Sequence, residues 1–136
     1  MLAVDGNSFH GEGIHILASF MYLCRHLEVL GCRCCNLTSG DLKCLFDHLS
    51  ELKSSCPRFR GRLQTWGLGN NRIDDHGVTA LMENLPSLFP YLGRKYDNGV
   101  SLAYNPVSMK MVRKLKDEMK EHSRVSSLII IILLQY

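Results

Sequence analysis

The chain has 136 residues, of which 46% are hydrophobic, and its formal net charge at pH 7 is +3. This length fits one domain, and the hydrophobic content excludes a chain that is disordered throughout. The positive charge is mild and lies mainly in residues 108–124, which excludes a basic surface over the whole chain.

Six cysteines lie between Cys24 and Cys56, a density compatible with disulfides, a metal site or free thiols. The chain does not open with the basic and apolar segments of a signal peptide, so we expect free thiols in a cytoplasmic protein. The apolar run 128–134 is much shorter than the roughly 20 residues of a membrane-crossing helix, so we expect no membrane span.

The chain aligns with itself when one column is formed by Asn7, Cys35, Asn71 and Asn105. Residues before this column alternate with a period of two, which is typical of a short strand, and later apolar residues recur every three or four positions, as in a helix. The apolar positions ahead of the column include Leu30, Trp66, Leu68 and Leu102. Each repeat is therefore predicted to be one strand followed by one helix.

In chain order, the alignment predicts units near 1–26, 27–62, 63–96 and 97–124, followed by an apolar tail at 125–136. The resulting fold class is α/β, a solenoid of about four repeats in which a curved parallel sheet lies inside and the helices lie outside. The regular unit has about 28 residues, and the spacing between columns predicts two insertions, at 54–62 and 86–99. Both carry proline and serine or glycine and are predicted to be surface loops.

Two helix starts are visible in the sequence. Thr38 precedes Asp41 by three residues, a spacing typical of a capping box in the second unit. In the third unit, Asp74 and Asp75 precede a helix predicted over Val78–Leu85.

The second and third units read Leu27-x-x-Leu30-x-Cys32-x-x-Cys35 and Leu63-x-x-Trp66-x-Leu68-x-x-Asn71. This pattern resembles the ribonuclease-inhibitor type of leucine-rich repeat, and the resemblance covers roughly residues 1–122. In that family the column residue, asparagine or cysteine, is buried and hydrogen-bonds the turn that leaves the strand. Among members of the family, the units are most similar to the C-terminal repeats of NOD-like receptors, which are cytosolic proteins of innate immunity.

The resemblance implies a protein-binding scaffold without a cofactor, forming part of the sensing or autoinhibitory region of a NOD-like receptor. The alternative is a protein similar to ribonuclease inhibitor or to a GTPase-regulating repeat protein. Asp97 stands where the first leucine of the fourth unit is expected, and the first unit begins within its strand. We therefore expect a fragment of a longer receptor, with a protein partner of unknown identity.

Three clusters resemble chemical sites. Cys32, Cys34 and Cys35 lie near Cys24, His26 and Cys44 in the sequence and invite a zinc site. Cys32, Cys35 and Cys44 are better explained as small apolar core residues. The group formed by residues 10, 12 and 15 (His, Glu, His) and the group at 74–76 both fall on turns between strand and helix, where polar side chains cap helices. No nucleophile, base and orienting group are spaced for catalysis, so we expect no enzyme.

Strand side chains that point away from the core form the predicted binding face. They are Asp5, Glu28, Arg33, Cys34, Gln64, Thr65, Gly69, Asn70, Ala103 and Tyr104. Of these, Arg33 and Tyr104 belong to residue types that dominate binding interfaces. The basic helix predicted at 109–124 lacks aromatic residues that stack on bases, so we expect no nucleic-acid partner.

Overall fold

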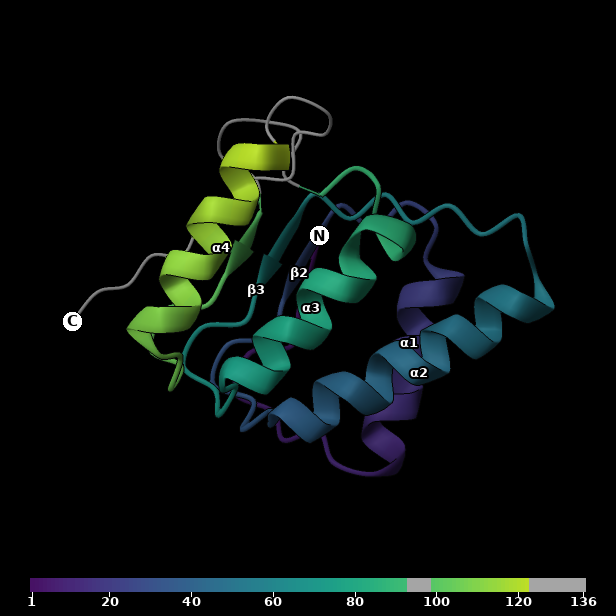
Figure 1. The fold of residues 1–136 in the computed structure, drawn as a ribbon. Coiled ribbons are helices and arrows are strands. Elements are labelled where there is room, and N and C mark those ends of the chain that lie inside the picture. Colours follow the sequence, from purple (N-terminus) through teal and green to yellow (C-terminus); the bar gives the residue numbers. More distant parts are fainter. Residues whose placement is uncertain (93–98, 123–136) are drawn as a thin grey trace.

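The computed structural model describes residues 1–92 and 99–122, which form four strand–helix units in chain order (Figure 1). The strands are β1 (Leu2–Ala3), β2 (Val29–Gly31), β3 (Thr65–Gly67) and β4 (Val100–Ser101). The helices are α1 (Glu12–Leu23), α2 (Ser39–Ser55), α3 (Asp75–Leu88) and α4 (Met109–His122). The predicted apolar tail at 125–136 lies outside the described residues.

The four strands form one sheet in the order β1-β2-β3-β4, and every neighbouring pair is parallel. Equivalent positions of the units meet across this sheet, because Leu30 pairs with Leu2 on one side and with Trp66 on the other. Helices α1, α2 and α3 each return the chain so that the next strand starts beside the previous one. The predicted α/β class with a parallel sheet is therefore confirmed.

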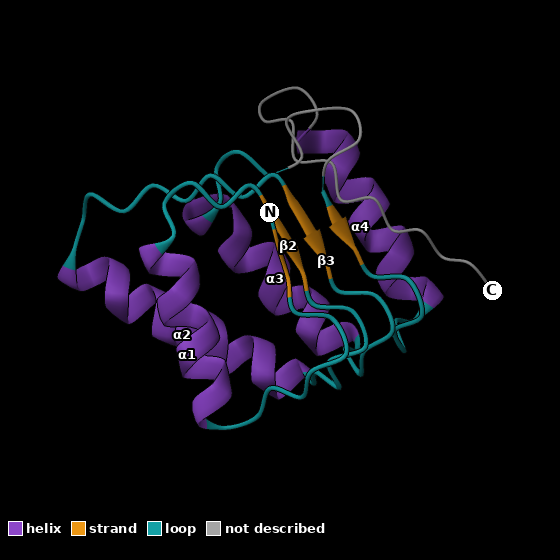
Figure 2. Ribbon diagram, turned by 180° about the vertical axis from the view of Figure 1, so that it is seen from behind, coloured by secondary structure: helices purple, strands orange, loops and turns teal. Residues whose placement is uncertain are grey.

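The helices lie on one side of the sheet, and no described helix covers the opposite side (Figure 2). Because strand side chains alternate, Leu30 and Trp66 point toward the helices. A side chain at the position of Gly31 or Gly67 would point to the uncovered side. We call this uncovered side the open face.

Helix α2 starts at the predicted capping box. Thr38 Oγ1 accepts a hydrogen bond from the amide of Asp41 at 3.2 Å, and the amide of Thr38 donates to Asp41 Oδ2 at 2.8 Å. At the start of α3, Asp74 Oδ1 accepts hydrogen bonds from the amide of His76 at 2.9 Å and from Ser39 Oγ at 2.6 Å. The hydrogen bond from Ser39 lowers the pKa of Asp74 and joins the starts of two neighbouring helices.

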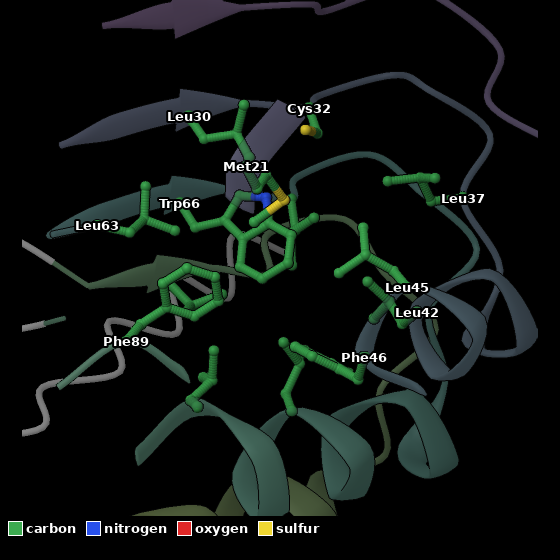
Figure 3. Close-up of a cluster of buried hydrophobic side chains, with 14 of the residues drawn as sticks. Met21, Leu30, Cys32, Leu37, Leu42, Leu45, Phe46, Leu63, Trp66 and Phe89 are labelled. Carbon is green, nitrogen blue, oxygen red and sulfur yellow. The ribbon is translucent and has the colours of Figure 1, made fainter. Parts of the chain in front are cut away.

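The core is centred on Trp66, which is fully buried between the sheet and the helices (Figure 3). Its ring meets Phe46 of α2 and Phe89 edge to face, with ring centroids 6.1 and 6.0 Å apart. Truncating a buried aromatic side chain of this size to alanine costs about 3–5 kcal/mol. Strand β3 is thereby held against α2 and against the residue that follows α3.

The two predicted surface loops are only partly loops, and this corrects the sequence analysis. Helix α3 continues past the predicted end at Leu85, since Pro86 removes only one amide donor near the helix terminus. In the other insertion, Phe59 is 4% exposed and stacks on Tyr22 of α1, with ring centroids 5.0 Å apart. Buried apolar side chains, Phe59 in one segment and Leu88, Phe89 and Leu92 in the other, hold the described parts of both against the domain. Residues 93–98 of the second predicted loop lie outside the described residues.

Candidate functional site

The end of β3 is tied to the preceding unit by Asn71, which is buried with 7% of its surface exposed. Its Oδ1 accepts hydrogen bonds from the amides of Cys35 and Leu37 at 2.9 and 3.0 Å. Its Nδ2 donates to the carbonyls of Cys32 and Leu68 at 2.8 and 3.0 Å. A longer contact of 3.3 Å joins Nδ2 to the carbonyl of Gly69. One side chain therefore bonds five backbone groups from two units and fixes the position of the strand exits.

The other column residues make fewer contacts with the unit before them. Asn105 Oδ1 accepts a hydrogen bond from the amide of Ile73 at 2.9 Å. Cys35 donates its Sγ–H to the carbonyl of Val4 at 3.3 Å, a weaker bond. Asn7 is exposed, donates from Nδ2 to the carbonyl of Val4 at 2.8 Å, and its Oδ1 has no hydrogen-bonding partner within residues 1–92 and 99–122.

Burial sets the state of the core thiols. Burial raises the pKa of the Cys32 thiol to about 12 and also raises the pKa of Cys35. Both are protonated, weakly nucleophilic groups at neutral pH. The core position expected for Cys44 is wrong in part, because this side chain is half-buried at the core's edge and faces His15 of α1.

A row of left-handed residues borders the open face directly after the strands. Gly6, Cys34, Asn70 and Tyr104 have φ angles of 76°, 55°, 55° and 58°. This conformation costs a residue other than glycine about 1–2 kcal/mol, so the strand pairing and the column must hold it in place. The side chains of Cys34 and Asn70 are exposed here, with Asn70 Nδ2 3.2 Å from Cys34 Sγ.

The floor of the open face is made of small residues. Equivalent positions across the four strands are Ala3, Gly31, Gly67 and Ser101. Asp5 lies against Gly31, where an added Cβ would be 2.9 Å from its Oδ1, and it accepts a hydrogen bond from the amide of Arg33 at 2.7 Å.

Arg33 lies across β3 on this floor. A Cβ added at Gly67 would be 3.4 Å from Arg33 Nε, and one added at Gly69 would be 4.0 Å from its Cγ. The side chain is exposed, and its guanidinium has no ion-pair or hydrogen-bond partner in the described part of the chain. The glycines thus provide the space in which an unpaired cation rests on the sheet.

The remaining residues of the predicted binding face are more scattered. Glu28 and Gln64 precede the strands, and the carbonyl of Glu28 accepts hydrogen bonds from the amides of Gln64 and Thr65 at 2.8 and 3.1 Å. The side chains of adjacent extended residues point to opposite sides, so Gln64 and Thr65 cannot both lie on the open face. Tyr104 stands at the far border of the face and is 61% exposed.

The polar cluster near residues 10–15 is not assembled as one site. His10 Nδ1 lies 3.8 Å from Asp41 Oδ2, whereas His15 Nε2 lies 3.6 Å from Cys44 Sγ. No three His, Cys, Asp or Glu side chains within residues 1–92 and 99–122 are arranged to hold a metal ion.

Sequence analysis missed the contact between α1 and α2. Here His15 meets Cys44, and the rings of His15 and His48 meet edge to face with centroids 4.6 Å apart. The available signal was the spacing of four residues between Cys44 and His48, which puts both on one helix face. The partner helix could not be read from that spacing.

Comparisons with known proteins show similarity of fold. No family model matches the chain, and no curated protein matches it. A solved structure described as leiomodin-1 actin-binding site 2 is similar, with a TM-score of 0.66 and 11% sequence identity, over 99% of this chain and 69% of that one. At this identity the likeness concerns the fold alone.

These findings correct the family expected from the sequence. The resemblance to ribonuclease-inhibitor-type leucine-rich repeats and to NOD-like receptors of innate immunity is wrong, since no such family matches and the similar structure is an actin-binding site of leiomodin. The physical reason is that apolar columns report which positions are buried between parallel strands and helices. Any stack of such units needs them, whatever its family.

No helix within residues 1–92 and 99–122 combines the length and the apolar content needed to cross a bilayer.

Proposed function

We propose that this chain is a protein-binding scaffold, a short solenoid of four strand–helix units that contacts its partner through the open face. The observation that carries the proposal is the exposed, unpaired guanidinium of Arg33 on its glycine floor. Arginine is enriched among the residues that dominate protein interfaces, because its planar group binds carboxylates and carbonyl oxygens in fixed geometry. The small residues around it leave room for a partner to approach the sheet.

The row of left-handed residues also supports the open face as the surface that contacts the partner. Cys34 and Asn70 project at its border, where the strand exits are fixed by the buried side chain of Asn71. A partner would therefore meet a preformed surface and would lose little conformational entropy in ordering it.

We further propose that the protein acts without catalysis or a cofactor and that it works in the cytoplasm. The free state of all six cysteines supports a reducing compartment. Actin is the first partner to test, because the similar solved structure is described as an actin-binding site.

The test is a titration of monomeric actin with the wild-type chain and with two charge-reversal variants. Arg33→Glu removes the proposed anchor, and Arg113→Glu makes the same charge change at an exposed position on α4. We expect Arg33→Glu to weaken binding by roughly 30-fold or more, as expected for the loss of an interface anchor, and Arg113→Glu to bind like the wild type. Equal effects of the two variants would place the contact outside the open face, and no binding of the wild type would reject actin.

A further inference from the structure

A hollow of about 380 Å³ lies over the contact between α1 and α2. Both helices lie on the side of the sheet away from the open face (Figure 1). It contains the half-buried thiol of Cys44, whose Sγ lies 3.6 Å from Nε2 of His15. That separation is within hydrogen-bonding reach for sulfur. The volume is in the range that admits a small molecule.

The second histidine holds the first in place. The ring of His48 meets His15 edge to face at 4.6 Å between centroids, and it is itself held by Ser19 Oγ at 3.4 Å and Glu51 Oε2 at 3.5 Å. His48 is therefore a positioning residue for the His15 ring. The imidazole of His15 is kept beside the thiol, where it can accept the thiol proton.

Three charged side chains also line the hollow, all from α2. Lys43 pairs with Asp47 at 3.2 Å, and Glu51 lies beside His48. The two carboxylates outnumber the one ammonium group. The hollow therefore favours a neutral or positively charged reagent over an anion.

We propose that Cys44 and His15 form a thiol–imidazole pair that exchanges with low-molecular-weight disulfides of neutral or positive charge. His15 takes the proton from Cys44, and the thiolate attacks one sulfur of the disulfide. A new S–S bond forms at Cys44, the original S–S bond breaks, and the other half leaves as a thiolate that takes up a proton. The disulfide is the only co-reactant.

The other thiols provide contrasts within the same molecule. Cys34 is more exposed than Cys44, but its polar neighbour is the amide of Asn70, which is not a base. Accessibility alone therefore predicts that Cys34 reacts faster, whereas the proposal predicts that Cys44 does. Cys32 is fully buried and stays unmodified as long as the protein is folded.

The experiment treats the reduced full chain at pH 7 with 2-hydroxyethyl disulfide, a neutral probe, and follows each cysteine by peptide mass spectrometry. We expect Cys44 to react faster than Cys34. His15→Gln should slow Cys44 by roughly tenfold, because an unassisted thiol is only a few per cent thiolate at this pH, and should leave Cys34 unchanged. Above about pH 9.5, where thiols ionise without help, the two proteins should react at Cys44 with similar rates.

The convergence at high pH distinguishes a base from a residue that only shapes the hollow. A deficit in His15→Gln that persists at every pH would overturn the proposal, as would a Cys44 that reacts no faster than Cys34 at pH 7. Unmodified Cys32 in both proteins confirms that the rates are those of the folded chain.

Discussion

Asn71 and Asn7 occupy the same position of two units and have opposite surroundings. Asn71 is buried and bonds five backbone groups, two of which are amides in the preceding unit. Asn7 is exposed at the edge strand, and its carbonyl oxygen has no partner among the described residues. The asparagine of this column therefore stabilises the fold chiefly by binding the unit before its own.

The largest expected effect is that of Asn71→Ala. The change leaves two buried amides and the carbonyl of Cys32 unpaired, whereas the carbonyl of Leu68 keeps a hydrogen bond from Asn105 Nδ2 at 2.7 Å. Each unsatisfied buried group costs about 1–3 kcal/mol. Partial solvation of the cavity reduces the sum, so we expect a loss of about 3–5 kcal/mol in the free energy of unfolding, measured by urea titration. A loss below about 1 kcal/mol would remove the distinction between the two asparagines.

The next largest effect is the pH dependence of the free energy of unfolding that the buried thiol of Cys32 causes. The Cys32 thiol keeps its proton in the folded state up to about pH 12, whereas the unfolded thiol loses it near its usual pKa of about 8.5. The contribution of this thiol to stability is therefore full below its pKa in the unfolded state. It is lost as the pH rises from that pKa toward the pKa in the folded state. From pH 8.5 to 10.5 this group should lower the free energy of unfolding by about 2–3 kcal/mol.

Urea titrations at both pH values measure this loss, and Cys32→Ala is the control. Its own stability should fall less steeply over the same interval, because the variant lacks the thiol. Parallel pH dependences of wild type and variant would mean that Cys32 ionises alike in both states.

Asn105 should lie between the two extremes. Its Oδ1 accepts one amide of the preceding unit, that of Ile73, so Asn105→Ala is expected to cost about 1–2 kcal/mol in the same urea titration. A cost as large as that of Asn71→Ala would show that the number of amides accepted does not determine the effect.

The smallest effect is expected for Asn7→Ala, the matched control of the series. Water replaces the lost contacts of an exposed side chain, so the free energy of unfolding should change by less than about 1 kcal/mol. A larger loss would indicate that Asn7 has a partner as Asn71 does.

The sequence predicted the strand–helix alternation because the columns of apolar residues have fixed periods. It could not predict that Arg33 rests on Gly67, since that contact joins two strands whose side chains on the open face follow no apolar pattern. The meeting of His15 and Cys44 depends on how two helices pack, which spacing along one chain does not specify. The same limit explains the buried Phe59, whose segment reads as a polar loop.

The most direct test of the proposed function uses two native thiols on different sides of the molecule. Cys34 borders the open face and Cys44 lies between the helices, so each reports whether a partner covers its surroundings. Alkylation of both by iodoacetamide is followed by mass spectrometry with and without saturating monomeric actin. A partner on the open face should protect Cys34 and leave the rate at Cys44 unchanged, whereas protection of Cys44 alone, or of neither thiol, would contradict the proposal.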